Sequence, residues 1–163
     1  MPATPYCYEY PRPAVTVDMV VLAHRAGEVV ALLVRRGGEP FAGSWAIPGG
    51  FLDIDEEIEV GVRRELREET GLQFAAQLSF LGVFGTPGRD PRGRTISLAY
   101  VAYLPGEPPE VAGGDDASDA EWRPATPDDP GTPLAFDHAE ILRKGLDWLN
   151  GRDGVDQAGL FRT

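Results

Sequence analysis

Residues 50–72 read GFLDIDEEIEVGVRRELREETGL, and this stretch carries most of the information about the fold. Its acidic, helix-forming composition predicts an amphipathic helix from about residue 56 to residue 70. Three apolar residues spaced four apart are expected to form its buried stripe: Ile58, Val62 and Leu66. Asp55 is the expected N-cap, because its carboxylate can accept hydrogen bonds from the first free amides. Gly71 stands where a left-handed C-cap belongs.

The same helix carries a group of carboxylates that points to metal chemistry. Glu65, Glu68 and Glu69 are three or four residues apart, so a helix places them on one face within a single turn. Such carboxylates repel one another unless a cation neutralises them, and their hard oxygens suit Mg²⁺ or Mn²⁺. Arg64 is placed to orient Glu68, and the carbonyl of Gly50 is a candidate main-chain ligand.

A plainer interpretation of this charge run is a solvated helix face with Arg–Glu pairs. The complete spacing of the motif favours the metal site. For Glu56, which precedes the helix or starts it, a structural or capping role and a metal-linked role both stay open. Gly61 lies in the helix interior, where glycine costs about 1 kcal/mol relative to alanine, so we expect another backbone to pack there.

The flanking sequence predicts helices packed on a mixed sheet, which is an α+β fold. The expected strands cover residues 15–23, 29–34, 46–52, 77–84, 95–104 and 120–123, and a final amphipathic helix covers residues 138–150. The strands at 15–23 and 29–34 form a pair around the turn HRAGE, and the nearly continuous apolar run at 95–104 predicts a central strand. We divide the chain into an extended arm (1–13), one domain (14–150) and a tail (151–163).

Composition narrows the possible partners. The chain has 163 residues and a formal net charge of -11, with 15 basic and 26 acidic residues, which fits one domain and disfavours nucleic acid and anionic membranes as partners. A single cysteine, Cys7, excludes an internal disulfide, and two histidines are too few for a Cys/His zinc site. No leader-like or membrane-length apolar run is present, so we expect a cytoplasmic protein.

The motif of residues 50–72 resembles the signature of the Nudix hydrolase family at every specified position. The resemblance implies an α/β/α sandwich with a mixed central sheet. It also implies hydrolysis of a nucleoside diphosphate derivative, a small-molecule substrate, by a water molecule with divalent cations. By the same resemblance Glu68 and Glu69 are metal ligands, and Glu65 is a ligand or the general base. A homodimer is expected from the family and from the tyrosine-rich arm.

Segments outside the motif are similar to the ADP-ribose pyrophosphatase branch: VTVDMVVL, RRGGEPFAGSWAIPGGF, FGTPGRDPRGRTISLAYVA and LAFDHAEIL. This implies cleavage of ADP-ribose to AMP and ribose 5-phosphate. Four arginines are candidates to grip the diphosphate or the terminal ribose through forked hydrogen bonds, unless they are ordinary solvated loop residues: Arg36, Arg89, Arg92 and Arg94. The alternatives are another nucleoside diphosphate substrate, such as a dinucleotide, a nucleotide sugar or a damaged nucleotide, and a non-catalytic module that senses ADP-ribose.

Several further residues have two interpretations. Phe41 and Trp45 could stack an adenine, although packing of their loop on the sheet is the simpler explanation. Asp137 and His138 are expected as the N-cap and first turn of the last helix rather than as catalytic groups. A second acidic group is expected to be a solvated loop, with one member as a candidate extra carboxylate: Asp115, Asp116, Asp119 and Glu121.

Overall fold

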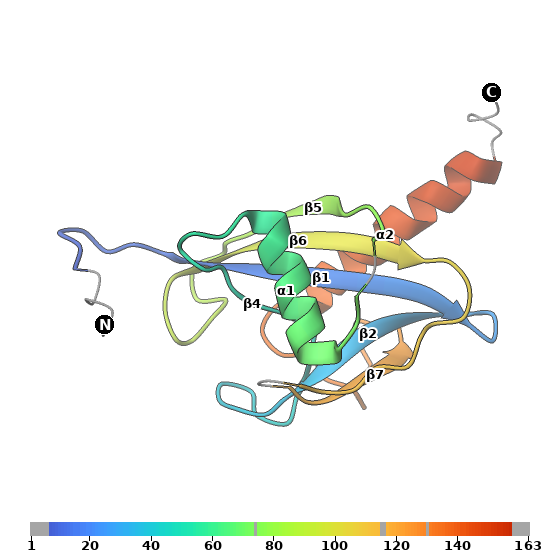
Figure 1. Cartoon of the computed structure of the whole chain (residues 1–163), viewed down its shortest axis with the longest axis horizontal. Coiled ribbons are helices and arrows are strands. Elements are labelled where there is room, and N and C mark those ends of the chain that lie inside the picture. The colour runs from blue at the N-terminus through green and yellow to red at the C-terminus, as the bar shows by residue number, and fades with distance from the viewer. Residues whose placement is uncertain (1–6, 74, 115–116, 130, 158–163) are drawn as a thin grey trace.

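The computed structural model describes residues 7–73, 75–114, 117–129 and 131–157. In this part of the chain, seven strands form one mixed sheet between two helices (Figure 1). The elements in chain order are β1 (Ala14–Arg25), β2 (Glu28–Arg36), β3 (Trp45–Ala46), β4 (Gly49–Phe51), α1 (Ile58–Thr70), β5 (Ser79–Phe84), β6 (Thr95–Leu104), β7 (Ala117–Pro124) and α2 (His138–Gln157). The sheet order is β3-β2-β1-β6-β5, with β4 also paired to β1 and β7 to β2.

Strand β1 is the centre of the sheet and changes partner along its length. On one side it runs parallel to β6 over ten residue pairs, from Ala14 with Thr95 to Ala23 with Leu104. On its other side it pairs first with the short strand β4 and only later, near its end, with β2. The sheet therefore opens on this side of β1, between β4 and β2, and the candidate site lies at this opening.

The hairpin between β1 and β2 follows from its two turn residues. Ala26 and Gly27 both have positive φ, at 51° and 85°, and they close the pair Arg25 with Glu28. Two-residue turns of this kind match the twist of the strands they join. The predicted pairing around HRAGE is therefore confirmed.

Alternating side chains of β1 enter two separate cores. One core combines Val17, Met19 and Val21 with residues of α1, and the other combines Val20 and Leu22 with residues of α2. Helix α1 contributes Val62 and Leu66, and α2 contributes Ile141, Leu142 and Leu149. Figure 1 shows α1 in front of the sheet and α2 behind it. This arrangement confirms the predicted α/β/α sandwich with a mixed sheet.

The start of α1 differs from the prediction. The helix begins at Ile58, and its N-cap is Glu57, which makes no side-chain capping bond, so the prediction of Asp55 as N-cap was wrong. A turn in which the amide of Glu56 donates to the carbonyl of Asp53 delays the helix. Ile58 is 37% exposed and is not a core residue, because α1 meets the core only from Gly61 onward.

Other boundaries agree more closely. The strand at 95–104 is confirmed at both ends, and Gly71 is the predicted C-cap, with φ of 71° and its amide donating to the carbonyl of Arg67. Strand β7 is longer than predicted, and α2 continues to Gln157. The division into arm, domain and tail stays a prediction. No helix in the described ranges is long and apolar enough to cross a membrane.

Candidate active site

A cavity of about 410 Å³ lies at the opening of the sheet beside β1, with a size typical of small-molecule sites. Its walls come from β1, the loop after β2, β4, α1, the loop between β5 and β6, and the start of α2. Six residues that matter for its chemistry are Asp18, Arg36, Glu65, Glu69, Arg92 and His138. Segments far apart in the sequence therefore meet at one polar site.

Arg64 organises the carboxylates of α1. Its guanidinium donates to both oxygens of Glu56, at 2.8 and 2.9 Å, to Glu65 at 2.8 Å and to Glu68 at 3.1 Å. A further bond, 3.1 Å long, reaches the carbonyl of Phe51 and ties α1 to β4. The bond from Arg64 is the largest cause that lowers the pKa of Glu56. Glu56 therefore acts as the structural partner of Arg64 and does not line the cavity.

Glu69 is held differently, by the backbone at the start of β4. The amide of Gly49 donates to its Oε2 at 2.9 Å. Burial raises the pKa of Glu69 to about 8, the Gly49 amide opposes this, and the charges of Glu65 and Asp18 raise the pKa further. A Cβ at Gly50 would lie 2.5 Å from Oε1 of Glu65, so a larger residue here would displace that carboxylate. The start of β4 thus brings backbone into direct contact with the acidic face of α1.

These residues fit a divalent metal ion in chemistry, although they are not arranged as a formed site. Within the described residues, no three acidic or imidazole side chains stand in metal-binding geometry, because Arg64 holds Glu65 and Glu68 while Gly49 holds Glu69. The charges of Glu65 and Asp18 add to the effect of burial in raising the pKa of Glu69, and a bound cation would oppose that rise. Carboxylate and carbonyl oxygens are the ligands that Mg²⁺ and Mn²⁺ prefer.

A buried polar network behind Glu69 was not found from the sequence. Asp18 is 5% exposed; it accepts a short hydrogen bond from Ser97 and lies 3.7 Å from Nε2 of His138. The amide of Ile47 donates to Nδ1 of His138 at 2.9 Å, which places the imidazole proton on Nε2, facing Asp18. Burial lowers the pKa of His138, so the ring is neutral. The sequence signal was an aspartate in the apolar run VTVDMVVL.

The four candidate arginines have different environments. Arg36 and Arg92 line the cavity, and the Asp90 carboxylate binds the Arg92 guanidinium at 2.8 Å. Arg89 also lines the cavity, but its side chain is only 5% exposed and is bound by two hydrogen bonds to Asp137. Arg94 does not line the cavity and donates to the carbonyl of Gly85 at 2.5 Å.

The residues with two interpretations are now placed. Trp45 packs against the core cluster on the α2 side of the sheet and lies 4.7 Å from the guanidinium of Arg123, as the packing interpretation predicts. Phe41 is 41% exposed and packs edge-on against Phe136 at 4.8 Å, in the segment before α2. His138 begins α2 yet lines the cavity, and the side chain of Asp137 binds Arg89. In the second acidic group, Asp119 accepts from the amide of Ala120 and Glu121 binds Arg123. Asp115 and Asp116 lie outside the described residues.

The structure is an α/β/α sandwich in which an acidic helix and two glycines face a polar cavity. Residues 12–149 match the family model of the NUDIX domain, and the chain belongs to that family. Nudix hydrolases generally use divalent metal ions.

Two curated relatives cover most of the chain. It is 41% identical over 143 residues to an ADP-ribose pyrophosphatase of Methanocaldococcus jannaschii, covering 87% of this chain and 78% of that protein. It is 30% identical to an ADPR responsive transcriptional repressor, NtrR, of Acinetobacter baylyi, covering 88% of this chain and 57% of the repressor. The chain therefore spans less than two thirds of the repressor's length.

Solved structures agree in fold and family. The NUDIX domain of Shewanella oneidensis NrtR, complexed with ADP ribose, gives a TM-score of 0.77 at 31% identity, covering 86% of this chain and 90% of that one. A MutT/nudix family protein from Enterococcus faecalis gives a TM-score of 0.78 at 33% identity, covering 90% of this chain and 66% of that one.

Proposed function

We propose that this chain acts in the cytoplasm and hydrolyses ADP-ribose to AMP and ribose 5-phosphate, using Mg²⁺ or Mn²⁺. The observation that carries the proposal is the meeting of Glu65, Glu69 and Gly50 in a cavity that Arg36 and Arg92 also line. Carboxylates suit divalent cations, and guanidinium groups suit phosphates. The relative with 41% identity, an ADP-ribose pyrophosphatase, supports this substrate.

Hydrolysis adds water across the pyrophosphate link. The water oxygen bonds to one phosphorus, and the bridging oxygen departs with the other phosphate. A divalent ion at this site would neutralise phosphate charge and make the attacking water more acidic. We assign the ion to Glu65, Glu68, Glu69 and the carbonyl of Gly50, with Glu65 or Glu68 accepting the proton of the water. Arg64 orients these two carboxylates through the bonds described above.

The arginines divide into two roles. Arg36 and Arg92 are proposed to bind the diphosphate, since both line the cavity. Arg89 also lines the cavity, but its side chain is only 5% exposed, compared with 41% for Arg92, and its Nε and Nη2 donate to Asp137. We therefore give Arg89 a supporting role in the cavity wall. Arg94 is left out of the proposed site, because it is outside the cavity lining and its guanidinium donates to the carbonyl of Gly85. Glu68 is also outside the lining, but it is bound by Arg64, which lines the cavity.

A comparison of substrates tests the proposal directly. Wild-type protein is incubated with Mg²⁺ and, in turn, ADP-ribose, NADH, diadenosine polyphosphates and nucleotide sugars, and products are separated and quantified. We expect the highest kcat/KM for ADP-ribose, equal yields of AMP and ribose 5-phosphate, and no turnover in EDTA. A higher kcat/KM for another substrate would transfer the proposal to that compound.

A second candidate function, sensing of ADP-ribose without hydrolysis, is favoured by the similarity to the repressor NtrR. Binding alone does not require three carboxylates gathered on one helix face. Tight binding of ADP-ribose in calorimetry, combined with no hydrolysis of any compound above, would establish the sensor and reject the enzyme.

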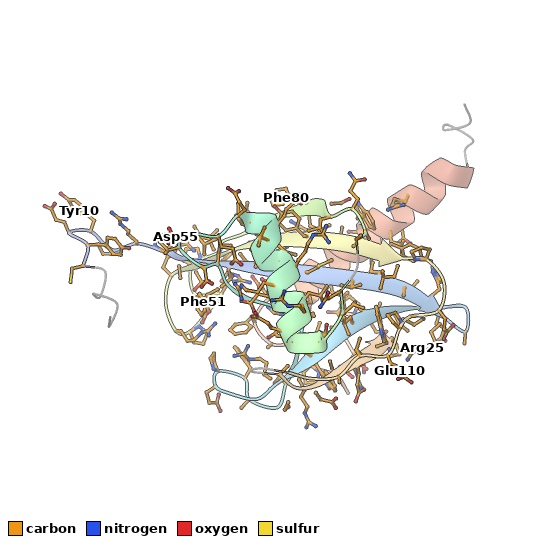
Figure 2. The ribbon with its side chains drawn as sticks, viewed as in Figure 1. Tyr10, Arg25, Phe51, Asp55, Phe80 and Glu110 are labelled. Carbon is orange, nitrogen blue, oxygen red and sulfur yellow. The ribbon has the colours of Figure 1, made fainter. Side chains whose placement is uncertain are left out.

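We also propose a homodimer. Tyr8 and Tyr10 in the arm are 44% and 73% exposed, and Figure 2 shows Tyr10 far from the body of the domain. Sedimentation velocity on the full chain measures the mass in solution, and a species of 17.6 kDa at all concentrations would reject the dimer.

A further inference from the structure

His138 is buried beside the cavity, and the hydrolytic chemistry proposed above gives it no role. It is the first residue of α2, it lines the cavity, and it is 5% exposed. Buried polar groups are nearly always hydrogen-bonded to particular partners. The partners of this imidazole therefore indicate what it does.

Residues 47–49, here called the β3–β4 linker, present two backbone donors to two different helices. Pro48 has no N–H, so the donors are the amides of Ile47 and Gly49. The amide of Ile47 donates to Nδ1 of His138 in α2, at 2.9 Å. The amide of Gly49 donates to Oε2 of Glu69 in α1, also at 2.9 Å. The linker thus connects two helices that lie on opposite faces of the sheet (Figure 1).

Strand β1 leaves the β3–β4 linker little room to move. Ile47 is 2% exposed, and the carbonyl of Pro48 accepts the amide of Met19 at 2.9 Å. Gly49 lies so close to β1 that a Cβ there would overlap the carbonyl oxygen of Val17. Because proline also fixes its own φ, a shift at Ile47 is carried to Gly49 rather than absorbed between them.

Two further buried side chains fix the proton on the imidazole. Nδ1 of His138 can accept a hydrogen bond only when the ring proton is on Nε2. Nε2 lies 3.7 Å from Oδ1 of Asp18, and the hydroxyl of the fully buried Ser97 donates to the other oxygen of this carboxylate. The negative charge of Asp18 favours the proton on Nε2, which leaves Nδ1 as the acceptor for Ile47.

We propose that His138 is a positioning residue for the carboxylate of Glu69 and acts through the β3–β4 linker. The ring fixes the amide of Ile47, and the linker in turn fixes the amide of Gly49 that holds Glu69. The next residue is Gly50, the candidate main-chain ligand. The inference rests on the proposed function, since it assumes that Glu69 and Gly50 bind a divalent ion. Loss of a group that orients metal ligands typically lowers metal affinity or activity about 10- to 100-fold.

Two amide variants of His138 separate its bond to Ile47 from the rest of the ring. The amide oxygen of His138→Asn can take the place of Nδ1 and accept from Ile47, whereas His138→Gln extends its amide toward Nε2 and Asp18. Calorimetry without substrate measures Mn²⁺ affinity. We expect His138→Asn to bind Mn²⁺ nearly as well as wild type and His138→Gln to bind it about tenfold or more weakly. The kcat for ADP-ribose should follow the same order, with KM at saturating Mn²⁺ near the wild-type value.

Amide hydrogen exchange in EDTA measures the β3–β4 linker directly. In His138→Gln, exchange at Gly49 should become about tenfold or more faster, although the ring itself binds Ile47. In His138→Asn it should stay near the wild-type rate. Wild type supplies a measurement that does not depend on the folding of a variant, because neighbouring amides that open together are protected to a similar degree. Protection of Ile47 more than about a hundredfold above that of Gly49 would overturn the proposal.

His24→Gln is the matched control. His24 lies outside the cavity lining, and its Nδ1 is 2.9 Å from the hydroxyl of Tyr103, so Mn²⁺ affinity and Gly49 exchange should not change. Unchanged Mn²⁺ affinity or unchanged Gly49 exchange in His138→Gln would overturn the role of His138. Equal losses in His138→Asn and His138→Gln would also overturn it, because the acceptor for Ile47 would then not matter.

Failure of this role and failure of the proposed function give different results. If wild type binds Mn²⁺ but does not hydrolyse ADP-ribose, the proposed function fails, while calorimetry and exchange still decide the role of His138. If wild type hydrolyses ADP-ribose and His138→Gln matches it in Mn²⁺ affinity and exchange, the enzyme stands and His138 is not a positioning residue. Absence of Mn²⁺ binding by wild type would overturn both.

Discussion

The backbone amide of Gly49 donates a hydrogen bond of 2.9 Å to Oε2 of Glu69. This bond joins the first residue of β4 to the last turn of α1, across twenty residues of sequence. It turns one carboxylate of the helix away from solvent and toward the cavity. The acidic face of α1 is therefore folded inward, where a divalent cation can compensate its charge.

Replacing Glu69 by glutamine tests its assignment as a metal ligand. The amide oxygen of Glu69→Gln can still accept from Gly49, so the fold should survive, while the charge that attracts the cation is lost. We expect the Mg²⁺-dependent kcat to fall at least about 10²-fold, as loss of several kcal/mol of charge stabilisation implies. Glu59→Gln, an exposed change on the same helix, is the control. Undiminished release of AMP by Glu69→Gln would remove this residue from the metal site.

The pH dependence of stability provides a test without substrate. The pKa of Glu69 is raised from 4.5 to about 8 in the folded protein, so the folded state binds more protons than the unfolded chain between these values. The stability that this group contributes is complete below pH 4.5 and is lost as the pH rises to 8. In EDTA, the unfolding free energy of wild type minus that of Glu69→Gln should fall from pH 5 to 8.

The subtraction is needed because His138 has the opposite effect. Its pKa is lowered by burial, so its contribution is present above pH 6.5 and is lost as the pH falls. This contribution is common to wild type and Glu69→Gln and cancels in the difference. Urea unfolding at each pH supplies the values, and a difference that stays flat or rises would show that Glu69 is ionised at low pH. Adding Mg²⁺ should reduce the pH dependence of the difference.

Whether a feature was predicted correctly depends on how far apart in the sequence the residues that form it lie. The stripe of Val62 and Leu66 and the cap at Gly71 are local patterns, and the sequence was sufficient for them. The helix start was missed because Glu56 binds Arg64, eight residues away, instead of entering the first turn. Local rules for caps and periodicity contain no information about such a partner.

The site shows the same division. The spacing of the motif predicted Glu65 and Glu69 as site residues, and both line the cavity. The contacts between Asp18 and His138, and between Arg89 and Asp137, join residues 120 and 48 positions apart. These pairs come together only because β1, the β5–β6 loop and the start of α2 are neighbours in the fold. A local sequence motif therefore could not predict either contact.

Asp137→Asn tests whether the ion pair between Arg89 and Asp137 stabilises the fold. The change keeps the shape but leaves a guanidinium that is 5% exposed without its full ionic partner, and we expect a loss of about 2–3 kcal/mol in unfolding free energy. Asp128→Asn is the matched control, because the pair of Asp128 with Arg143 is exposed and should contribute less than about 1 kcal/mol. Denaturant unfolding at pH 7 measures the unfolding free energy of both variants. Equal small losses would show that the pair of Arg89 with Asp137 does not stabilise the fold.

Gly61→Ala has two opposite effects on stability, one through helix propensity and one through packing. Alanine favours a helix interior over glycine by about 1 kcal/mol, yet a Cβ at Gly61 would lie 2.7 Å from Cδ1 of Leu52 and 2.9 Å from Oε2 of Glu56. The expectation that another backbone packs at this glycine was therefore wrong, because the neighbours are side chains. Glu56 cannot move freely, since both its oxygens bind Arg64.

We expect Gly61→Ala to lower the unfolding free energy by about 1 kcal/mol, because overpacking of about 1–3 kcal/mol exceeds the propensity gain. It should also lower kcat, because displacing Glu56 disturbs the Arg64 that orients Glu65 and Glu68. Gly151→Ala in α2 is the matched change, since a Cβ there meets nothing within 4 Å, and it should stabilise by up to about 1 kcal/mol. If both alanine variants are equally stabilised and kcat is unchanged, the hydrogen bonds between Glu56 and Arg64 do not require the space beside Gly61.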